Sequence, residues 1–98
     1  MTDAPASVRL DPTLDLKAAG PLTREILAAR GQDLAVDASE VRRLGGQCLQ
    51  VLLAAQAAWA SDGHALEIRE PSPAFVEGVA LMGAADRFGL ELQQEPTP

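Results

Sequence analysis

Segments of two different periodicities alternate along this chain, and that alternation restricts its fold more than any other feature. Three segments have strand patterns, either a period of two or a short apolar run bounded by acids: 7–11, 33–37 and 65–69. Three others carry apolar residues at helical spacing: 16–29, 47–61 and 73–82. With a last short strand predicted at 90–92, this order is typical of an α/β domain in which helices cover a sheet.

Capping residues give the predicted helices their starts. Asp15 is a good N-cap for the first helix, but Pro21 lies inside its pattern, so this helix either starts near Gly20 or has the proline in its first turn. Ser72 followed by Pro73 predicts the N-cap and first residue of the third helix. The segment between the second strand and the second helix, 38–46, is predicted to be a loop.

The length of 98 residues allows one domain with a single modest core, which excludes a two-lobed enzyme with an interdomain cleft. We expect a domain over 8–93, with flexible ends at 1–7 and 94–98. The predicted architecture is a central mixed sheet of about four strands covered by about three or four helices.

Charge and composition exclude several classes of partner. The net charge is −6, and only two of the eight basic residues lie after residue 49, so nucleic acid and anionic membrane surfaces are not expected partners. A single cysteine permits no internal disulfide. With no signal-peptide pattern and no apolar run near the roughly 18 residues that span a bilayer, we expect a soluble cytoplasmic protein without membrane insertion.

Few residues suggest chemistry. His64 has no patterned nucleophile or carboxylate partner, so a solvated turn residue is expected. Cys48 lies on the apolar face of its helix and predicts an inert core thiol, although its place near a helix start keeps a reactive thiol open. Gly45-Gly46 before a helix is a weak anion-site signal with no phosphate-loop motif around it. We expect no catalytic residues, no cofactor and no metal.

The segment 37–53 resembles the signature of STAS domains, the sulfate-transporter and anti-sigma-factor-antagonist modules. In that signature a strand leads through Asp-hydrophobic-Ser into an Asp-Ser-Ser-Gly turn and a leucine-rich helix. Seven residues of this chain fall on the pattern: Asp37, Ser39, Val41, Leu44, Leu49, Leu52 and Leu53.

Two flanking stretches are also similar to this family. The stretch 10–15 resembles the exit of the family's first strand, where Leu14 and Asp15 match. The stretch 72–83 resembles its Ser-Pro third helix. The resemblance covers about residues 8–93 and implies a single STAS-like domain.

The departures from the family pattern concern the phosphorylation switch. The family's Asp-Ser pair at the start of the second helix aligns with Gly45-Gly46. Antagonist members are phosphorylated on that serine by an anti-sigma kinase, whereas Gly46 has no hydroxyl to accept phosphate. Because Ser39 aligns with a serine that is structural in the family, we expect the partner-switching cycle to be absent here.

The resemblance implies a non-catalytic regulatory protein that docks on another protein. The stretch from Leu44 into the second helix further resembles short stand-alone STAS proteins of alphaproteobacterial chemotaxis clusters. This resemblance implies a histidine kinase of the CheA type as the first expected partner. The alternatives are a STAS subunit of an ABC-type lipid transporter and a conventional anti-sigma factor antagonist. The expected partner-binding residues surround the start of the second helix: Asp15, Gly45, Gly46, Gln47 and Gln50.

Overall fold

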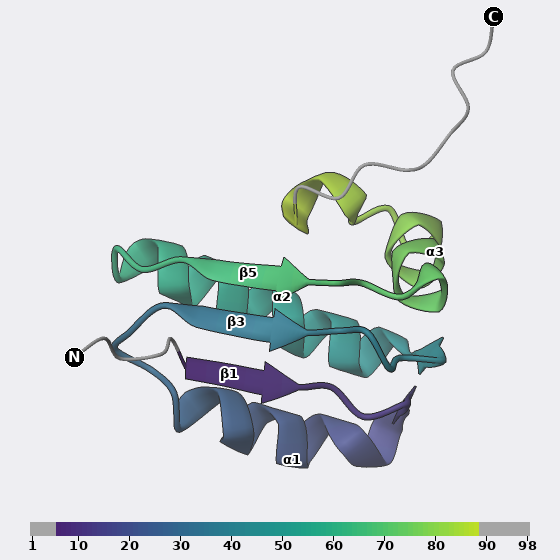
Figure 1. Cartoon of the computed structure of the whole chain (residues 1–98), viewed down its shortest axis with the longest axis horizontal. Helices are drawn as coiled ribbons and strands as arrows, with labels where there is room; N and C mark the ends of the chain where they lie inside the picture. Colours follow the sequence, from purple (N-terminus) through teal and green to yellow (C-terminus); the bar gives the residue numbers. More distant parts are fainter. Residues whose placement is uncertain (1–5, 89–98) are drawn as a thin grey trace, which may run out of the picture.

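The computed structural model describes residues 6–88 and confirms the alternating α/β order (Figure 1). Its strands are β1 (Ala6–Arg9), β2 (Thr13–Leu14), β3 (Leu34–Asp37), β4 (Arg43–Leu44) and β5 (Leu66–Arg69). Its helices are α1 (Leu16–Leu27), α2 (Gly46–Ser61), α3 (Pro73–Leu81) and the 3₁₀ helix η1 (Ala85–Phe88). No helix within the described residues is long and apolar enough to cross a membrane.

The main sheet has three parallel strands in the order β1-β3-β5, and Val8, Val36 and Ile68 lie side by side across it. Its strands are joined through α1 and α2, as parallel neighbours must be. Every strand pair within residues 6–88 is parallel, which replaces the mixed sheet expected from the sequence. The strand expected at 90–92 lies outside the described residues.

A second, two-stranded parallel sheet pairs β2 with β4. It places Thr13 beside Arg43 and Leu14 beside Leu44. The sequence predicted only a loop over 38–46, because two residues are too few to show a period. This small sheet is nevertheless the element that positions the starts of α1 and α2.

The core lies between the sheet and the helices and contains only apolar side chains among the buried residues of the described chain. Trp59 and Phe75 are the largest fully buried side chains. The Trp59 indole N–H donates a hydrogen bond to the Gln32 carbonyl at 2.8 Å, so its polar atom is satisfied inside the core. Trp59 is therefore a core residue.

Helix α1 differs from both alternatives that the sequence left open. It begins at Leu16, directly after the N-cap Asp15, and Pro21 lies inside the helix rather than in its first turn. Proline has no N–H, so the Lys17 carbonyl has no main-chain donor four residues ahead. The Asp15 cap predicted from the sequence is confirmed: its carboxylate accepts a hydrogen bond from the Ala18 N–H at 3.1 Å.

Only part of the apolar pattern of α1 faces the core. Leu22 and Ile26 are buried, whereas Leu16 and Leu27 are 70% and 54% exposed. The sequence placed all four on one helical pattern, and the sheet covers a narrower strip than that pattern spans. Two large apolar side chains of α1 therefore remain at the surface.

Helix α3 starts as the sequence predicted. Ser72 is its N-cap, with the hydroxyl accepting from the Phe75 N–H at 3.1 Å, and Pro73 is its first residue. The same hydroxyl donates to the Val41 carbonyl at 2.6 Å, and the Ser72 N–H donates to the Ala38 carbonyl at 3.1 Å. The start of α3 thus holds the segment that leads into β4.

Candidate docking site at the start of helix α2

The β2-β4 pair sets the N-termini of α1 and α2 next to each other. Each strand runs directly into a helix N-cap, β2 into Asp15 and β4 into Gly45. The Gly45 N–H donates to the Leu14 carbonyl at 2.8 Å, which continues the ladder by one residue. Both helices therefore begin at the carboxyl ends of the parallel strands, the edge at which open α/β sheets bind their ligands (Figure 1).

Gly45 is required by packing rather than by its torsion angles. Its φ of −93° and ψ of 163° are open to any residue. A Cβ atom at this position, however, would lie 2.9 Å from the Leu14 carbonyl oxygen, closer than real Cβ contacts come. A side chain at position 45, including the aspartate of the family pattern, would therefore require β2, β4 or the helix start to shift.

Gly46 has no such restriction. A Cβ atom there would meet nothing within 4 Å, and φ is positive only at Gly31, Gly63 and Gly83 among the described glycines. Gly46 is the first residue of α2 and is exposed. A side chain at position 46 would point into solvent at the helix start, where a partner has access.

The start of α2 has no side-chain cap, because Gly45 carries no hydrogen-bonding side chain. The first backbone N–H groups of a helix have no partner within it and carry a partial positive charge. Arg42 and Arg43 are exposed just before the helix and form no salt bridge within residues 6–88. The turn therefore presents donors and positive charge, with the acidic Asp15 at its side.

Cys48 lies in the first turn of α2 and is fully buried. Its thiol donates a weak hydrogen bond to the Asp15 carbonyl at 3.4 Å. Burial raises the pKa of the Cys48 thiol above its usual value, and the nearby Asp15 and Asp11 carboxylates raise it further. A helix start lowers a thiol pKa where it is accessible, but burial outweighs that effect here, and the expected inert core thiol is supported.

The structure brings four of the five expected docking residues together: Asp15, Gly45, Gly46 and Gln47. The Cβ position of Gly45 is 3.8 Å from the Asp15 Cα, and the two following residues continue α2. Gln50 lies one turn further along the helix and is exposed, like Gln47. Both glutamines also line a groove between α2 and α1, which the sequence did not reveal.

The only histidine of the chain lies away from this site. His64 lies beyond the C-terminal end of α2, with its Nδ1 atom 3.4 Å from an Asp33 carboxylate oxygen. Its side chain is about one-third exposed, at the end of α2 opposite the docking turn. Within the described residues, no group of three or more His, Cys, Asp or Glu side chains is placed to hold a metal ion.

One comparison with known proteins gave a match. The family model described as "Mlab, STAS domain" matches residues 1–93, nearly the whole chain. Neither the search of curated proteins nor the search of solved structures found a match.

Proposed function

The chain belongs to the STAS domain family, and from that premise we propose that it is a regulatory module that docks on a partner protein through the start of α2. STAS domains commonly mediate protein–protein interactions and are generally non-catalytic. We propose that this chain likewise acts by binding, through the contact of its surface with a signalling protein. The observation that carries this proposal is the open, uncapped helix start at Gly46.

The geometry of the turn supports docking in three ways. Unpaired N–H groups at the start of α2 can receive acidic or carbonyl groups of a partner. Gly46 lets a partner backbone approach closely, since no Cβ stands in its way. Gln47 and Gln50 supply exposed amides that both donate and accept hydrogen bonds.

The proposed partner is a cytoplasmic histidine kinase of the chemotaxis type. The anti-sigma partner implied by the family resemblance carries an ATPase domain of the kind that histidine kinases also contain. Because position 46 has no hydroxyl, docking would not be switched by serine phosphorylation as in antagonist members. The ATPase of an ABC-type lipid transporter is the alternative partner, and identification of the bound ATPase separates the two.

The substitution Gly46→Asp tests the docking surface. It introduces a carboxylate where the family's phosphoserine would lie, and a partner group at the helix start would then meet an unpaired like charge or lose its own hydrogen bonds. Such an uncompensated charge costs on the order of a few kcal/mol when buried. We expect at least a tenfold loss of affinity for the purified partner recovered with the wild-type protein, measured by calorimetric titration.

The matched control is Ser61→Asp, which adds the same charge at the other end of the same helix. It should bind the partner like the wild type. Thermal melting of both variants must show that the domain remains folded. A folded Gly46→Asp variant with unchanged affinity would place the interface elsewhere and refute the proposal.

A further inference from the structure

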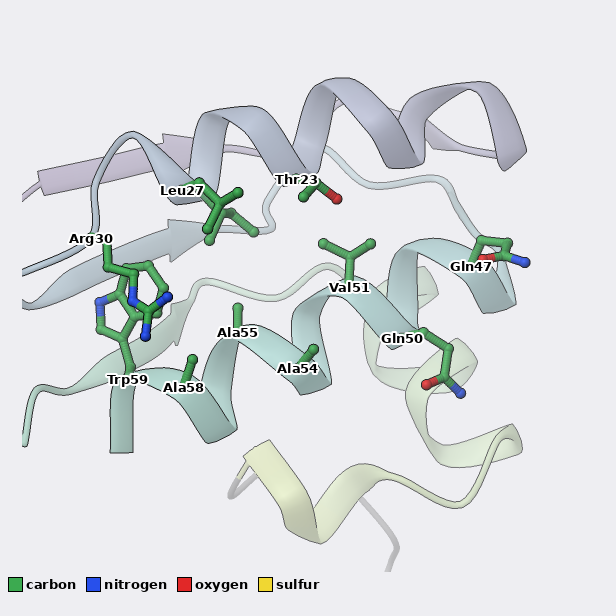
Figure 2. A pocket seen from close by; sticks show the side chains of 11 residues that line it. Thr23, Leu27, Arg30, Gln47, Gln50, Val51, Ala54, Ala55, Ala58 and Trp59 are labelled. Carbon is green, nitrogen blue, oxygen red and sulfur yellow. The ribbon is translucent and has the colours of Figure 1, made fainter. Parts of the chain in front are cut away.

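A groove of about 480 Å³ runs between α1 and α2, from Gln47 at the start of α2 to Trp59 near its end (Figure 2). Thr23 and Leu27 of α1 form one wall, and Val51, Ala54 and Ala58 of α2 form the other. From the level of Gln47 to that of Trp59, α2 covers about 18 Å at 1.5 Å per residue. That length fits three turns of another helix.

Leu27 of the α1 wall is exposed and lines the groove, and the exposed Leu16 continues the same side of the helix toward its start. Leu16, Thr23 and Leu27 recur at intervals of seven and four residues, which places them on one stripe of the helix. Leu16 is 70% and Leu27 is 54% exposed. Two leucines on one stripe, beside an open groove, form an apolar surface of the kind that marks a docking site.

The α2 wall carries no charge at all. None of its 16 residues is charged, although it lies at the surface of a protein with a net charge of −6. Beside the half-buried Val51, its groove side offers the small Ala54 and Ala58, which let a second helix approach closely. The groove also reaches Gln47 and Gln50, so it is continuous with the proposed docking turn.

The basic residues next to the groove indicate what kind of segment binds in it. On α1, Lys17 and Arg24 lie two turns apart and directly follow Leu16 and Thr23 of the stripe, so helix geometry puts them on an outer rim next to it. Both are exposed and without a salt bridge within residues 6–88. This rim is basic in an otherwise acidic protein and complements an acidic flank. A second copy does not supply such a flank, since Glu25 and Glu77 are the only acidic residues in α1, α2 and α3.

We propose that the groove between α1 and α2 receives an amphipathic helix of the partner protein. Its apolar face covers Leu27 and Val51, and acidic residues on one flank lie over Lys17 and Arg24. This proposal rests on the docking function proposed above and extends the interface from the start of α2 along three turns of the helix. The segment of the partner that binds in the groove is therefore an acidic helix with an apolar stripe.

Two synthetic helical peptides test this proposal. Both contain leucines at helical spacing and neither contains tryptophan; one carries glutamates along one flank and the other carries lysines at the same positions. Trp59, the only tryptophan of the chain, lines the groove and reports binding by its fluorescence. We expect the glutamate peptide to bind at least tenfold more tightly than the lysine peptide in low salt.

Two variants of the protein make the test specific. Leu27→Glu should abolish binding of the glutamate peptide, and its exposed position leaves the fold intact, which melting checks. The double variant Lys17→Glu, Arg24→Glu should reverse the preference toward the lysine peptide. Reversal requires charge pairing at the rim, which a general loss of stability would not produce.

Several results would overturn the proposal. They are failure of the glutamate peptide to bind, equal affinity for both peptides, and binding of the glutamate peptide that survives Leu27→Glu. A wild-type dimer in analytical ultracentrifugation that Leu27→Glu converts to monomer would identify a second copy as the occupant. The peptide assay contains no kinase, so its failure is distinguishable from failure of the Gly46→Asp test, which concerns the helix start.

Discussion

Helices α1 and α2 begin side by side, each directly after a strand of the same two-residue pair, yet their N-termini are built in opposite ways. At α1 the Asp15 carboxylate accepts the Ala18 N–H within the molecule. At α2 the N-cap is Gly45, which has no side chain to offer. At one helix start a side chain accepts from a backbone N–H group, whereas the neighbouring start has no side-chain cap and keeps its donors for solvent or for a partner.

The two adjacent glycines show why α2 is built this way. Gly45 is favoured by the fold, because a Cβ at this position would lie only 2.9 Å from the Leu14 carbonyl oxygen. That contact removes the only position from which an N-cap side chain could act. Gly46 is not imposed by the fold, since a side chain there meets open space. The difference separates a structural glycine from one whose place is at the proposed interface.

The largest effect is expected from Gly45→Ala. Its methyl group would approach the Leu14 oxygen to 2.9 Å, so β2, β4 or the helix start must shift. Overpacking of this kind costs about 2 kcal/mol, which corresponds to a melting temperature lower by about 10 °C in a domain of this size. Urea and thermal unfolding monitored by circular dichroism measure it.

Gly46→Ala is the matched control for that variant. It should be as stable as the wild type or more stable by up to about 1 kcal/mol, because alanine restricts the unfolded chain without strain here. Equal stability losses for the two variants would show that packing does not distinguish the two glycines.

A smaller loss is expected from Asp15→Ala, which removes the cap of α1. Loss of an N-cap costs about 1 kcal/mol. Asp15→Asn keeps an oxygen acceptor and should retain most of the stability, so it separates capping from charge. If Asp15→Ala unfolds at the same urea concentration as the wild type, solvent replaces the cap and the contrast between the two helix starts loses its energetic basis.

The sequence predicted the elements that have long patterns or strong caps. The three strands of the main sheet follow from alternation or from a short apolar run bounded by acids, the N-cap of α1 from Asp15, and the start of α3 from Ser72-Pro73. The place of Pro21 inside α1 was not predicted, since both alternatives that it left open were wrong. The sequence could not predict β2 and β4, because the pairing of two residues with two others depends on the tertiary structure and leaves no local period. The different roles of Gly45 and Gly46 follow from that same pairing, so the sequence could not predict them either.

The groove between α1 and α2 was hidden for another reason. Leu16 and Leu27 fit the apolar pattern of α1, so the sequence placed them with the core residues Leu22 and Ile26. Exposure depends on how much of that pattern the sheet and α2 cover, which periodicity does not encode. The absence of charge from α2 was visible in the sequence, but it also fits a helix buried on several sides.

The smallest effect is expected from Gly46→Asp in the free protein, and it tests whether the start of α2 is unsatisfied. A carboxylate in the first turn interacts favourably with the helix dipole and the free N–H groups, by about 0.3–1 kcal/mol at low ionic strength.

The neutral control Gly46→Asn removes the same glycine without adding charge. The Asp variant should therefore be more stable than the Asn variant in low salt, and the gap should shrink in about 1 M salt, where the Debye length is about 3 Å. The gap should also vanish at acidic pH as the carboxylate is protonated, since only the charged form gains from the dipole. Equal stability of the two variants in low salt at neutral pH would mean that the partial positive charge of the first N–H groups of α2 is already compensated. It would also mean that Arg42 and Arg43 do not stabilise a carboxylate at position 46. A gap that disappears with salt and acid would establish the start of α2 as an open, positively polarised surface beside the closed one of α1.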